Sequence, residues 1–91
     1  MTANIIEQLR YIIDELDQTI IASIAKRHEV SMQIGAYKEQ NGLNVYDKNR
    51  EQQLHQYHKK LSEEYNVNEE FVHAIFDLII KQSREIQRNK K

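Results

Sequence analysis

Residues 5–40 read IIEQLRYIIDELDQTIIASIAKRHEVSMQIGAYKEQ, and their pattern is the strongest indication of the architecture. Its first part carries an apolar side chain at every third or fourth position: Ile6, Leu9, Ile13, Leu16, Ile20 and Ile24. That spacing puts these side chains on one face of an α-helix. No proline interrupts the stretch, and the Asn41-Gly42 pair that follows is a typical C-terminal signal. The pattern predicts one helix from about residue 5 to about residue 40, roughly 50 Å long.

Two shorter helices are expected after it. Residues 42–46 read as a connecting loop, and Asp47 as the N-cap of a second helix that ends near residue 65. Asn68 reads as the N-cap of a third helix that ends near residue 87. The second helix carries Leu54, Tyr57 and Leu61 on one side, and the third is expected to bury Val72, Ile75, Phe76, Ile79 and Ile80. The fold class is therefore all-α, with one long and two shorter helices.

The long helix also predicts how the chain assembles. A chain of 91 residues permits a single domain, taken as residues 1–91. Two short helices cannot cover an apolar face about 50 Å long, and so small a domain gains from self-association. We therefore expect a second copy of the chain to cover that face, giving an intertwined homodimer.

Composition excludes several classes of function. There is no cysteine, so disulfides and thiolate metal sites are ruled out. The 13 basic and 14 acidic residues give a net charge of -1, which predicts neither nucleic acid nor a membrane surface as partner. The N-terminus lacks a signal-peptide pattern, and no apolar run approaches the roughly 20 residues of a membrane span. The expected location is the cytoplasm. The histidines form no convincing ligand set, so no metal is expected.

Polar side chains replace apolar ones further along each helical face. Continued beyond Ile24, the first stripe reaches Arg27 and Lys38, which lie 11 residues or about 16 Å apart. On the third helix, Ser83 and Gln87 continue the apolar face at a spacing of four. Each of these signals alone also fits a stripe that emerges into solvent or a helix end that frays.

Two further arginines extend the set. Arg50 lies one turn before Leu54 and so points inward from the second helix. Arg10 lies on the long helix 17 residues before Arg27, about 25 Å away, so one small ligand cannot touch both in one chain. Arg10 must come from an antiparallel partner chain if it serves the site, and is otherwise a surface arginine. Together, these mostly cationic and amide groups suit a compact dianion.

At this point the chain closely resembles the all-helical chorismate mutases, from about residue 5 to residue 87. The resemblance is carried by Leu9-Arg10 with Leu16-Asp17, by the Arg27…Gly35…Lys38 spacing, by Asp47-x-x-Arg50-Glu51, and by Ile79-Ile80-x-x-Ser83-x-x-x-Gln87. It implies three helices per subunit in an intertwined dimer with two shared sites. The implied activity is the isomerisation of chorismate to prephenate in phenylalanine and tyrosine biosynthesis.

The resemblance also implies catalytic roles. Arg10 would reach into the partner's site and pair with one substrate carboxylate, while Arg27 would hold the other from its own chain. Lys38 and Gln87 would donate from opposite sides to the ether oxygen of the enolpyruvyl bridge.

The remaining roles concern binding. Glu51 would accept from the ring hydroxyl, with the Asp47 backbone close by. Arg50 would add positive potential, and Ser83 would touch a carboxylate. The reaction is an intramolecular rearrangement that needs no nucleophile, metal or proton transfer, so no cofactor is expected.

Other functions remain open at this point. Relatives on the same fold act on 4-amino-4-deoxychorismate as mutases or cleave isochorismate to salicylate and pyruvate. The Asp47, Arg50 and Glu51 motif favours a ring hydroxyl and argues against the lyase, but it does not exclude the amino analogue. A non-catalytic helical dimer module is the alternative from another class. Docking to another shikimate-pathway enzyme also stays open.

Overall fold

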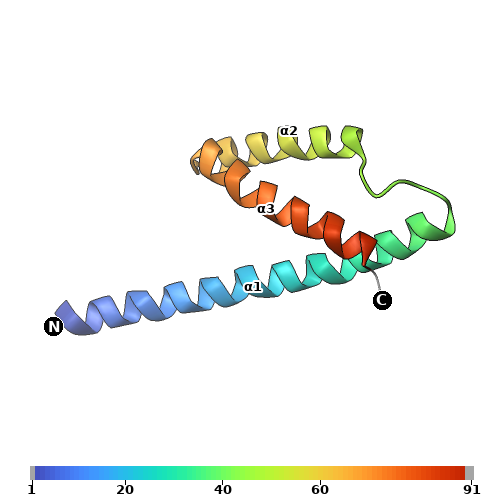
Figure 1. Ribbon diagram of the computed structural model, residues 1–91. Coiled ribbons are helices and arrows are strands. Elements are labelled where there is room, and N and C mark those ends of the chain that lie inside the picture. Colours follow the sequence, from blue (N-terminus) through green and yellow to red (C-terminus); the bar gives the residue numbers. More distant parts are fainter. Residues whose placement is uncertain (1, 90–91) are drawn as a thin grey trace.

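The protein is an all-helical chain of three helices. The computed structural model describes residues 2–89, and side chains from residue 4 onward. The helices are α1 (Thr2–Gln40), α2 (Lys48–Glu64) and α3 (Glu69–Arg88), and residues 2–89 contain no strand. Figure 1 shows the long α1 below a hairpin made of α2 and α3. The predicted fold class, with one long and two shorter helices, is confirmed for the chain.

The helix ends follow the capping residues in the sequence. Asp47 Oδ1 accepts the Arg50 N–H at 3.0 Å, and Asn68 Oδ1 accepts the Phe71 N–H at 2.9 Å, so both predicted caps are confirmed. Gly42, with φ of 64°, terminates α1 in the left-handed conformation that glycine adopts without strain. The start of α1 differs from the prediction. It lies at Thr2 rather than near residue 5, because nothing in residues 2–4 breaks a helix.

The third helix holds the molecule together. Within residues 2–89, α3 packs against both α1 and α2, whereas α1 and α2 do not pack on each other. The C-terminal end of α3 crosses the C-terminal half of α1, and the N-terminal half of α1 projects beyond the hairpin (Figure 1). The chain therefore measures 62 × 30 × 15 Å.

The crossing of α3 over α1 depends on a glycine. Gly35 is buried in α1, and a Cβ atom built on it would lie 2.6 Å from the Gln87 carbonyl oxygen and 2.7 Å from Gln87 Cα. Real Cβ atoms do not approach backbone that closely. The missing side chain is thus what allows the two helix backbones to meet, and it sets where the last turn of α3 lies.

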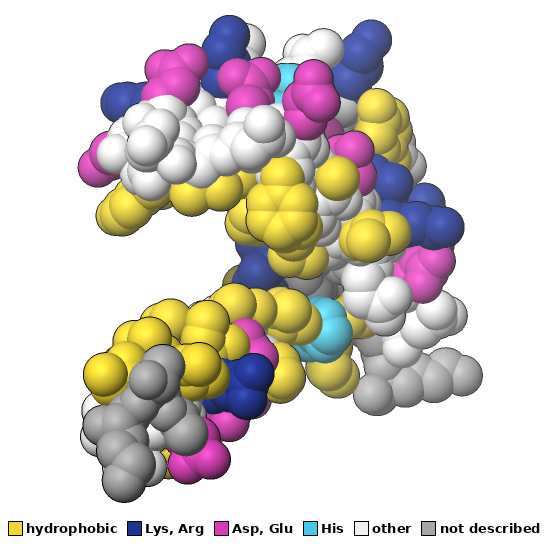
Figure 2. Space-filling model, turned by 90° about the vertical axis from the view of Figure 1, so that its left-hand side faces the viewer, with side chains coloured by type: hydrophobic (Ala, Val, Ile, Leu, Met, Phe, Trp, Pro, Cys, Tyr) yellow, Lys and Arg dark blue, Asp and Glu magenta, His cyan; other side chains and the backbone are white. Residues whose placement is uncertain are grey.

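The apolar face of α1 is left uncovered. No hydrophobic side chain among the described residues is buried, and those of the predicted stripe from Ile6 to Ile20 are 44–57% exposed. Figure 2 shows hydrophobic side chains on both sides of the open gap between α1 and the hairpin. On the hairpin, Ile75 and Tyr57 are exposed, and the other predicted apolar positions are only half-buried. The expected burial by α3 is therefore wrong for a single chain, because little packs on that side of the helix.

The chain exposes more surface than a compact monomer of the same mass would. The chain exposes 7737 Å². A compact monomer of 10.9 kDa would expose about 5,600 Å². The difference is roughly 2,000 Å² per chain, or about 4,000 Å² for two chains, which lies within the total area that obligate homodimer interfaces bury.

None of the three described helices has an apolar stretch of the length and hydropathy that crossing a membrane requires.

Replacing Gly35 by alanine is expected to destabilise the fold, although alanine is the better helix former. The added methyl group meets backbone of α3, and overpacking of this kind costs about 1–3 kcal/mol. Urea denaturation measures the loss, and amide exchange in the last turn of α3 should accelerate. Gly42→Ala is the control, since nothing lies within 4 Å of that position. It should cost about 1 kcal/mol of backbone strain and leave α3 protected. Unchanged exchange in Gly35→Ala would contradict the proposed role of the crossing.

Candidate active site

A pocket of about 520 Å³ lies where the C-terminal half of α1, the start of α2 and the end of α3 meet. Seven of the eight site residues predicted from the sequence line it: Arg27, Lys38, Asp47, Arg50, Glu51, Ser83 and Gln87. They come from all three helices and the residue that caps α2. The tertiary fold thus brings together side chains that are up to 60 positions apart in the sequence.

Lys38 and Gln87 form the best-defined contact of the pocket. Lys38 Nζ donates to Gln87 Oε1 at 3.1 Å and to the Val45 carbonyl oxygen at 2.8 Å. An ammonium group only donates, so it holds the amide oxygen of Gln87 toward itself and leaves the amide NH₂ for another acceptor. One N–H of Lys38 also remains. The pair therefore offers two donors from two different helices near one point.

Arg27 provides a cationic group that is not fully partnered. It is half-buried in α1, and its Nε is buried without a hydrogen-bond partner among the described residues. A buried guanidinium N–H without an acceptor is costly, and an anionic ligand would satisfy it. Arg27 is thus a natural contact for a carboxylate.

Two predicted residues are already engaged in local hydrogen bonds. Asp47 caps α2, which fixes the backbone at the start of that helix. Ser83 is 8% exposed, and its hydroxyl group donates to the Ile79 carbonyl oxygen at 3.0 Å. The Ser83 oxygen can still accept a hydrogen bond, and the hydroxyl group can rotate.

Glu51 has a partner that the sequence reasoning missed. Arg84 Nη1 lies 2.6 Å from both Glu51 Oε1 and Oε2, joining α3 to α2. Arg84 lies one residue after Ser83, beside the predicted stripe. Its spacing of four from Ile80, which also lines the pocket, was the signal that could have found it. Ser31, which is 6% exposed, is a second pocket residue without a predicted role.

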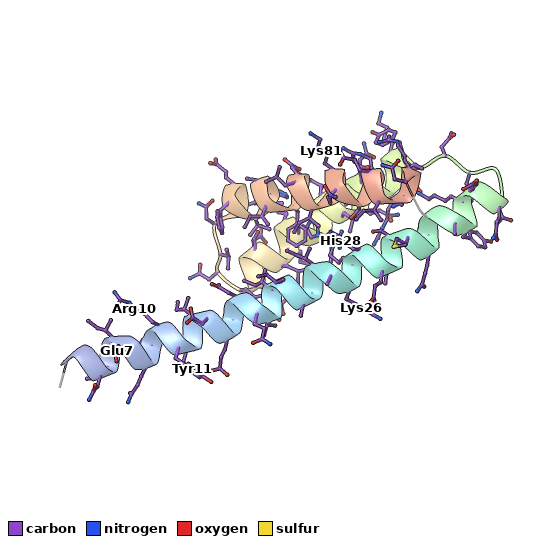
Figure 3. The ribbon with its side chains drawn as sticks, turned by 60° about the horizontal axis from the view of Figure 1, so that its bottom comes forward. Glu7, Arg10, Tyr11, Lys26, His28 and Lys81 are labelled. Atoms are coloured by element: carbon purple, nitrogen blue, oxygen red, sulfur yellow. The ribbon has the colours of Figure 1, made fainter. Side chains whose placement is uncertain are left out.

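Arg10 is the predicted site residue that the pocket of this chain does not contain. Figure 3 shows it on the projecting N-terminal half of α1. The pocket lies at the C-terminal half of that helix. The 17 residues between Arg10 and Arg27 correspond to about 25 Å along a helix. A single chain thus supplies the pocket without this arginine, as the sequence spacing predicted.

The charge of the pocket suits an anion. Five cationic side chains and two acidic ones line it, the cations being Lys26, Arg27, Lys38, Arg50 and Arg84. Lys26 pairs with Glu29 at 3.3 Å at the surface, where its side chain is 74% exposed. The described residues contain no group of three side chains placed to hold a metal ion.

Two stacked ring pairs, which include three of the histidines, join α2 to α3. His58 is 5% exposed and stacks on Phe76 with ring centroids 3.9 Å apart, and His55 stacks on His73 at 3.8 Å. Burial lowers the pKa of His58 below its ordinary value of 6.5. Neighbouring positive or titratable groups lower this pKa further, in the order Arg27, His73, His55 and Arg50. The neutral ring is therefore the form that the fold favours.

Residues 9–88 match the family described as chorismate mutase type II. The chain belongs to the chorismate mutase type II family. It is 31% identical over 81 residues to the chorismate mutase of Methanocaldococcus jannaschii, covering 89% of this chain and 82% of that protein. It is also 31% identical over 80 residues to the bifunctional chorismate mutase/prephenate dehydratase of Buchnera aphidicola, covering 88% of this chain and 22% of that larger protein. The predicted family and enzyme class, an isomerase of the chorismate mutase type, are confirmed.

The lowered pKa of His58 predicts that the stability of the fold depends on pH. A folded-state pKa below the unfolded value of 6.5 means that His58 stabilises the fold fully above pH 6.5. That contribution is lost as the pH falls below 6.5 and through the lowered folded value, because the unfolded chain then binds the proton more readily. Thermal unfolding between pH 7.5 and 5 should show this loss at fixed protein concentration. His58→Gln should flatten the slope, whereas His28→Gln, which removes a histidine on α1, should not. Equal slopes in all three proteins would refute the assignment.

Proposed function

We propose that this chain converts chorismate to prephenate in the pocket between its three helices, and that residues 1–91 act as one domain. The observation that carries the proposal is the convergence of Arg27, Lys38 and Gln87 on one cationic pocket in a chain of the chorismate mutase family. A non-catalytic helical module would give no reason for these side chains to meet. In this reaction one C–O bond breaks while one C–C bond forms within the same molecule.

The first task of the enzyme is conformational. A flexible dianion must fold into a compact, chair-like form with its two carboxylates at fixed places. Arg27, whose Nε has no hydrogen-bond partner within the described part of the chain, would hold one carboxylate, and Arg10 of a second chain would hold the other. A guanidinium is planar and permanently charged, so it fixes both the position and the orientation of a carboxylate.

The second task is electrostatic. As the C–O bond breaks, negative charge grows on the ether oxygen. Lys38 and Gln87 donate toward this oxygen with groups that are already held in place, so they stabilise the transition state more than the ground state. The Val45 carbonyl group helps to hold Lys38 in position before the substrate arrives.

The remaining pocket residues serve binding. Glu51 accepts a hydrogen bond from the ring hydroxyl, near the backbone that Asp47 fixes at the start of α2. Arg50 adds positive potential, and Ser83 contacts a carboxylate. This assignment favours a substrate with a ring hydroxyl, so isochorismate cleavage is not proposed. The mutase reaction on 4-amino-4-deoxychorismate is the second candidate.

The proposed enzyme is an intertwined homodimer. Three features support this: the exposed apolar face of α1, the excess surface of roughly 2,000 Å², and a pocket that lacks Arg10. The gap in Figure 2 has hydrophobic side chains on both sides, as a site for a second α1 would. An antiparallel α1 would cover the stripe and carry its own Arg10 to the pocket of its partner.

The metabolic role follows from the proposed reaction. Prephenate is a precursor of phenylalanine and tyrosine, so the proposed role is aromatic amino acid biosynthesis. The proposed location is the cytoplasm. The name of the relative from Buchnera joins a mutase to a prephenate dehydratase in one protein. For this shorter chain, docking to another shikimate-pathway enzyme would provide a similar proximity.

Replacing Lys38 by alanine is expected to lower kcat by about 100- to 1,000-fold, as losing one preorganised donor does elsewhere. The assay follows the loss of chorismate absorbance and resolves the product by chromatography. Lys26→Ala is the matched control, since Lys26 also borders the pocket but is tied to Glu29 at the surface. It should retain nearly full activity. Prephenate formation at the wild-type rate by Lys38→Ala would exclude the proposed mechanism.

The amide at position 87 predicts the pH dependence of the reaction. An amide does not titrate, so kcat/KM should stay flat from about pH 5 to 8. In Gln87→Glu, the side chain can donate only when protonated, so activity should rise as the pH falls. Initial rates across this range compare the two proteins while each remains folded. A steep loss of wild-type activity toward neutral pH would show that a titrating group, not Gln87, supplies the donor.

A further inference from the structure

Arg84 occupies a place in the pocket that the proposed mechanism does not use. It lies on α3 between Ile80 and Gln87, both of which line the same pocket. Its guanidinium reaches α2, where one nitrogen contacts both carboxylate oxygens of Glu51 at 2.6 Å. The two side chains are 28% and 26% exposed, so the ion pair is largely shielded from water. Water therefore screens the attraction between these two charges less than it screens that of an exposed pair.

A third element also contacts this arginine. The ring of Tyr46, in the loop that precedes α2, lies 6.0 Å from Arg84 Cζ. This distance is at the limit of a cation–π interaction. The guanidinium is thus held between a helix and a loop, and the orientation of Glu51 is fixed with it.

The ion pair changes what Glu51 can offer to a ligand. Each carboxylate oxygen accepts one contact from Arg84 and keeps further lone pairs free. Glu51 therefore remains an acceptor, while the positive charge beside it offsets its own negative charge. A neutral hydroxyl gains a hydrogen bond there. An ammonium group would meet the same acceptor together with the repulsion of Arg84.

The rest of the pocket strengthens this preference. Without the exposed Lys26, four cationic side chains still line the pocket against two acidic ones. Asp47, the second acid, is engaged as the cap of α2 through the Arg50 N–H. Glu51 is therefore the acidic group best placed to attract an ammonium, and Arg84 neutralises it.

We propose that Arg84 is a positioning residue that makes the Glu51 subsite select a substrate with a neutral ring hydroxyl over one with a ring ammonium. The inference rests on the proposed role of Glu51 as acceptor for the ring substituent. The aliphatic amine of 4-amino-4-deoxychorismate is largely protonated at neutral pH. In this proposal, the Arg84–Glu51 ion pair determines the preference for chorismate over that substrate.

The test measures kcat/KM for both substrates at pH 7 in the full-length protein. Arg84→Gln and Arg84→Met remove the charge, and Arg84→Lys keeps it while losing the planar fork. Both neutral variants should shift the preference toward the amino substrate by at least about tenfold, because the unpaired Glu51 then attracts the ammonium. Arg84→Lys should keep the wild-type preference within a few-fold. Arg88→Gln, which removes an exposed arginine one turn later, is the control and should leave the preference unchanged.

A purely structural Arg84 would give a different result. If it only ties α3 to α2, its neutral variants lower both kcat/KM values by the same factor, and the inference is overturned. Glu51→Gln separates this failure from that of the proposed function. If Glu51→Gln lowers activity on chorismate while the Arg84 variants keep the preference, the Glu51 role stands and only the Arg84 inference fails. If Glu51→Gln has no effect on chorismate, the Glu51 role itself fails.

Discussion

The close approach of α3 to α1 at Gly35 positions the residues of the pocket. A Cβ atom at that position would lie 2.6 Å from the Gln87 carbonyl oxygen, so the helices meet backbone to backbone. Because the approach is so close, Gln87 lies within 3.1 Å of Lys38, only one turn further along α1. One turn before the end of α3, the Arg84 side chain reaches Glu51 near the start of α2. The absence of a side chain at Gly35 thus allows the helix approach that brings Gln87 to Lys38 in the pocket.

The two halves of α1 have different roles: one half helps to form the pocket, and the other half carries the uncovered apolar face. Half of the long helix packs on α3 and forms the pocket, while the other half presents Ile6 to Ile20 to solvent in a single chain. A helix that served only to build one pocket would not need the projecting half. In the proposed dimer, this half covers its counterpart by hydrophobic burial and carries Arg10 to the second pocket. Stability and catalysis would then both depend on the same association.

The sequence predicted the elements of the fold well because each had a local signal. The 3.6-residue periodicity gave α1, and Asp47 and Asn68 gave the starts of α2 and α3. Burial was predicted less well. The apolar face of α3 was expected to be covered, but residues such as Ile75 remain exposed in one chain. Burial depends on what packs against a face, and periodicity does not contain that information.

The candidate site was predictable where polar side chains replaced apolar ones on a continuing stripe, as at Arg27, Lys38 and Gln87. The family resemblance added Glu51, and it gave a role to Arg10, which the spacing alone left as either a partner-chain contribution or a surface arginine. The roles of all these residues stay predictions. Arg84 was missed because it lies beside the stripe, and only the approach of α3 to α2 brings it to Glu51. The spacing of four from Ile80 indicates the side of α3 on which Arg84 lies, but no local pattern indicates a partner 33 positions away on another helix.

The most direct test of the account is subunit complementation between Arg10→Ala and Arg27→Ala. Each variant alone should be nearly inactive, because every site lacks one carboxylate clamp. Refolding the two together places an intact Arg27 of one chain opposite an intact Arg10 of the other, so each heterodimer regains one complete site. Random pairing should then restore about a quarter of the wild-type sites. Recovery near that level would show that two chains share each site. No recovery, with heterodimers verified by mass, would contradict the shared site.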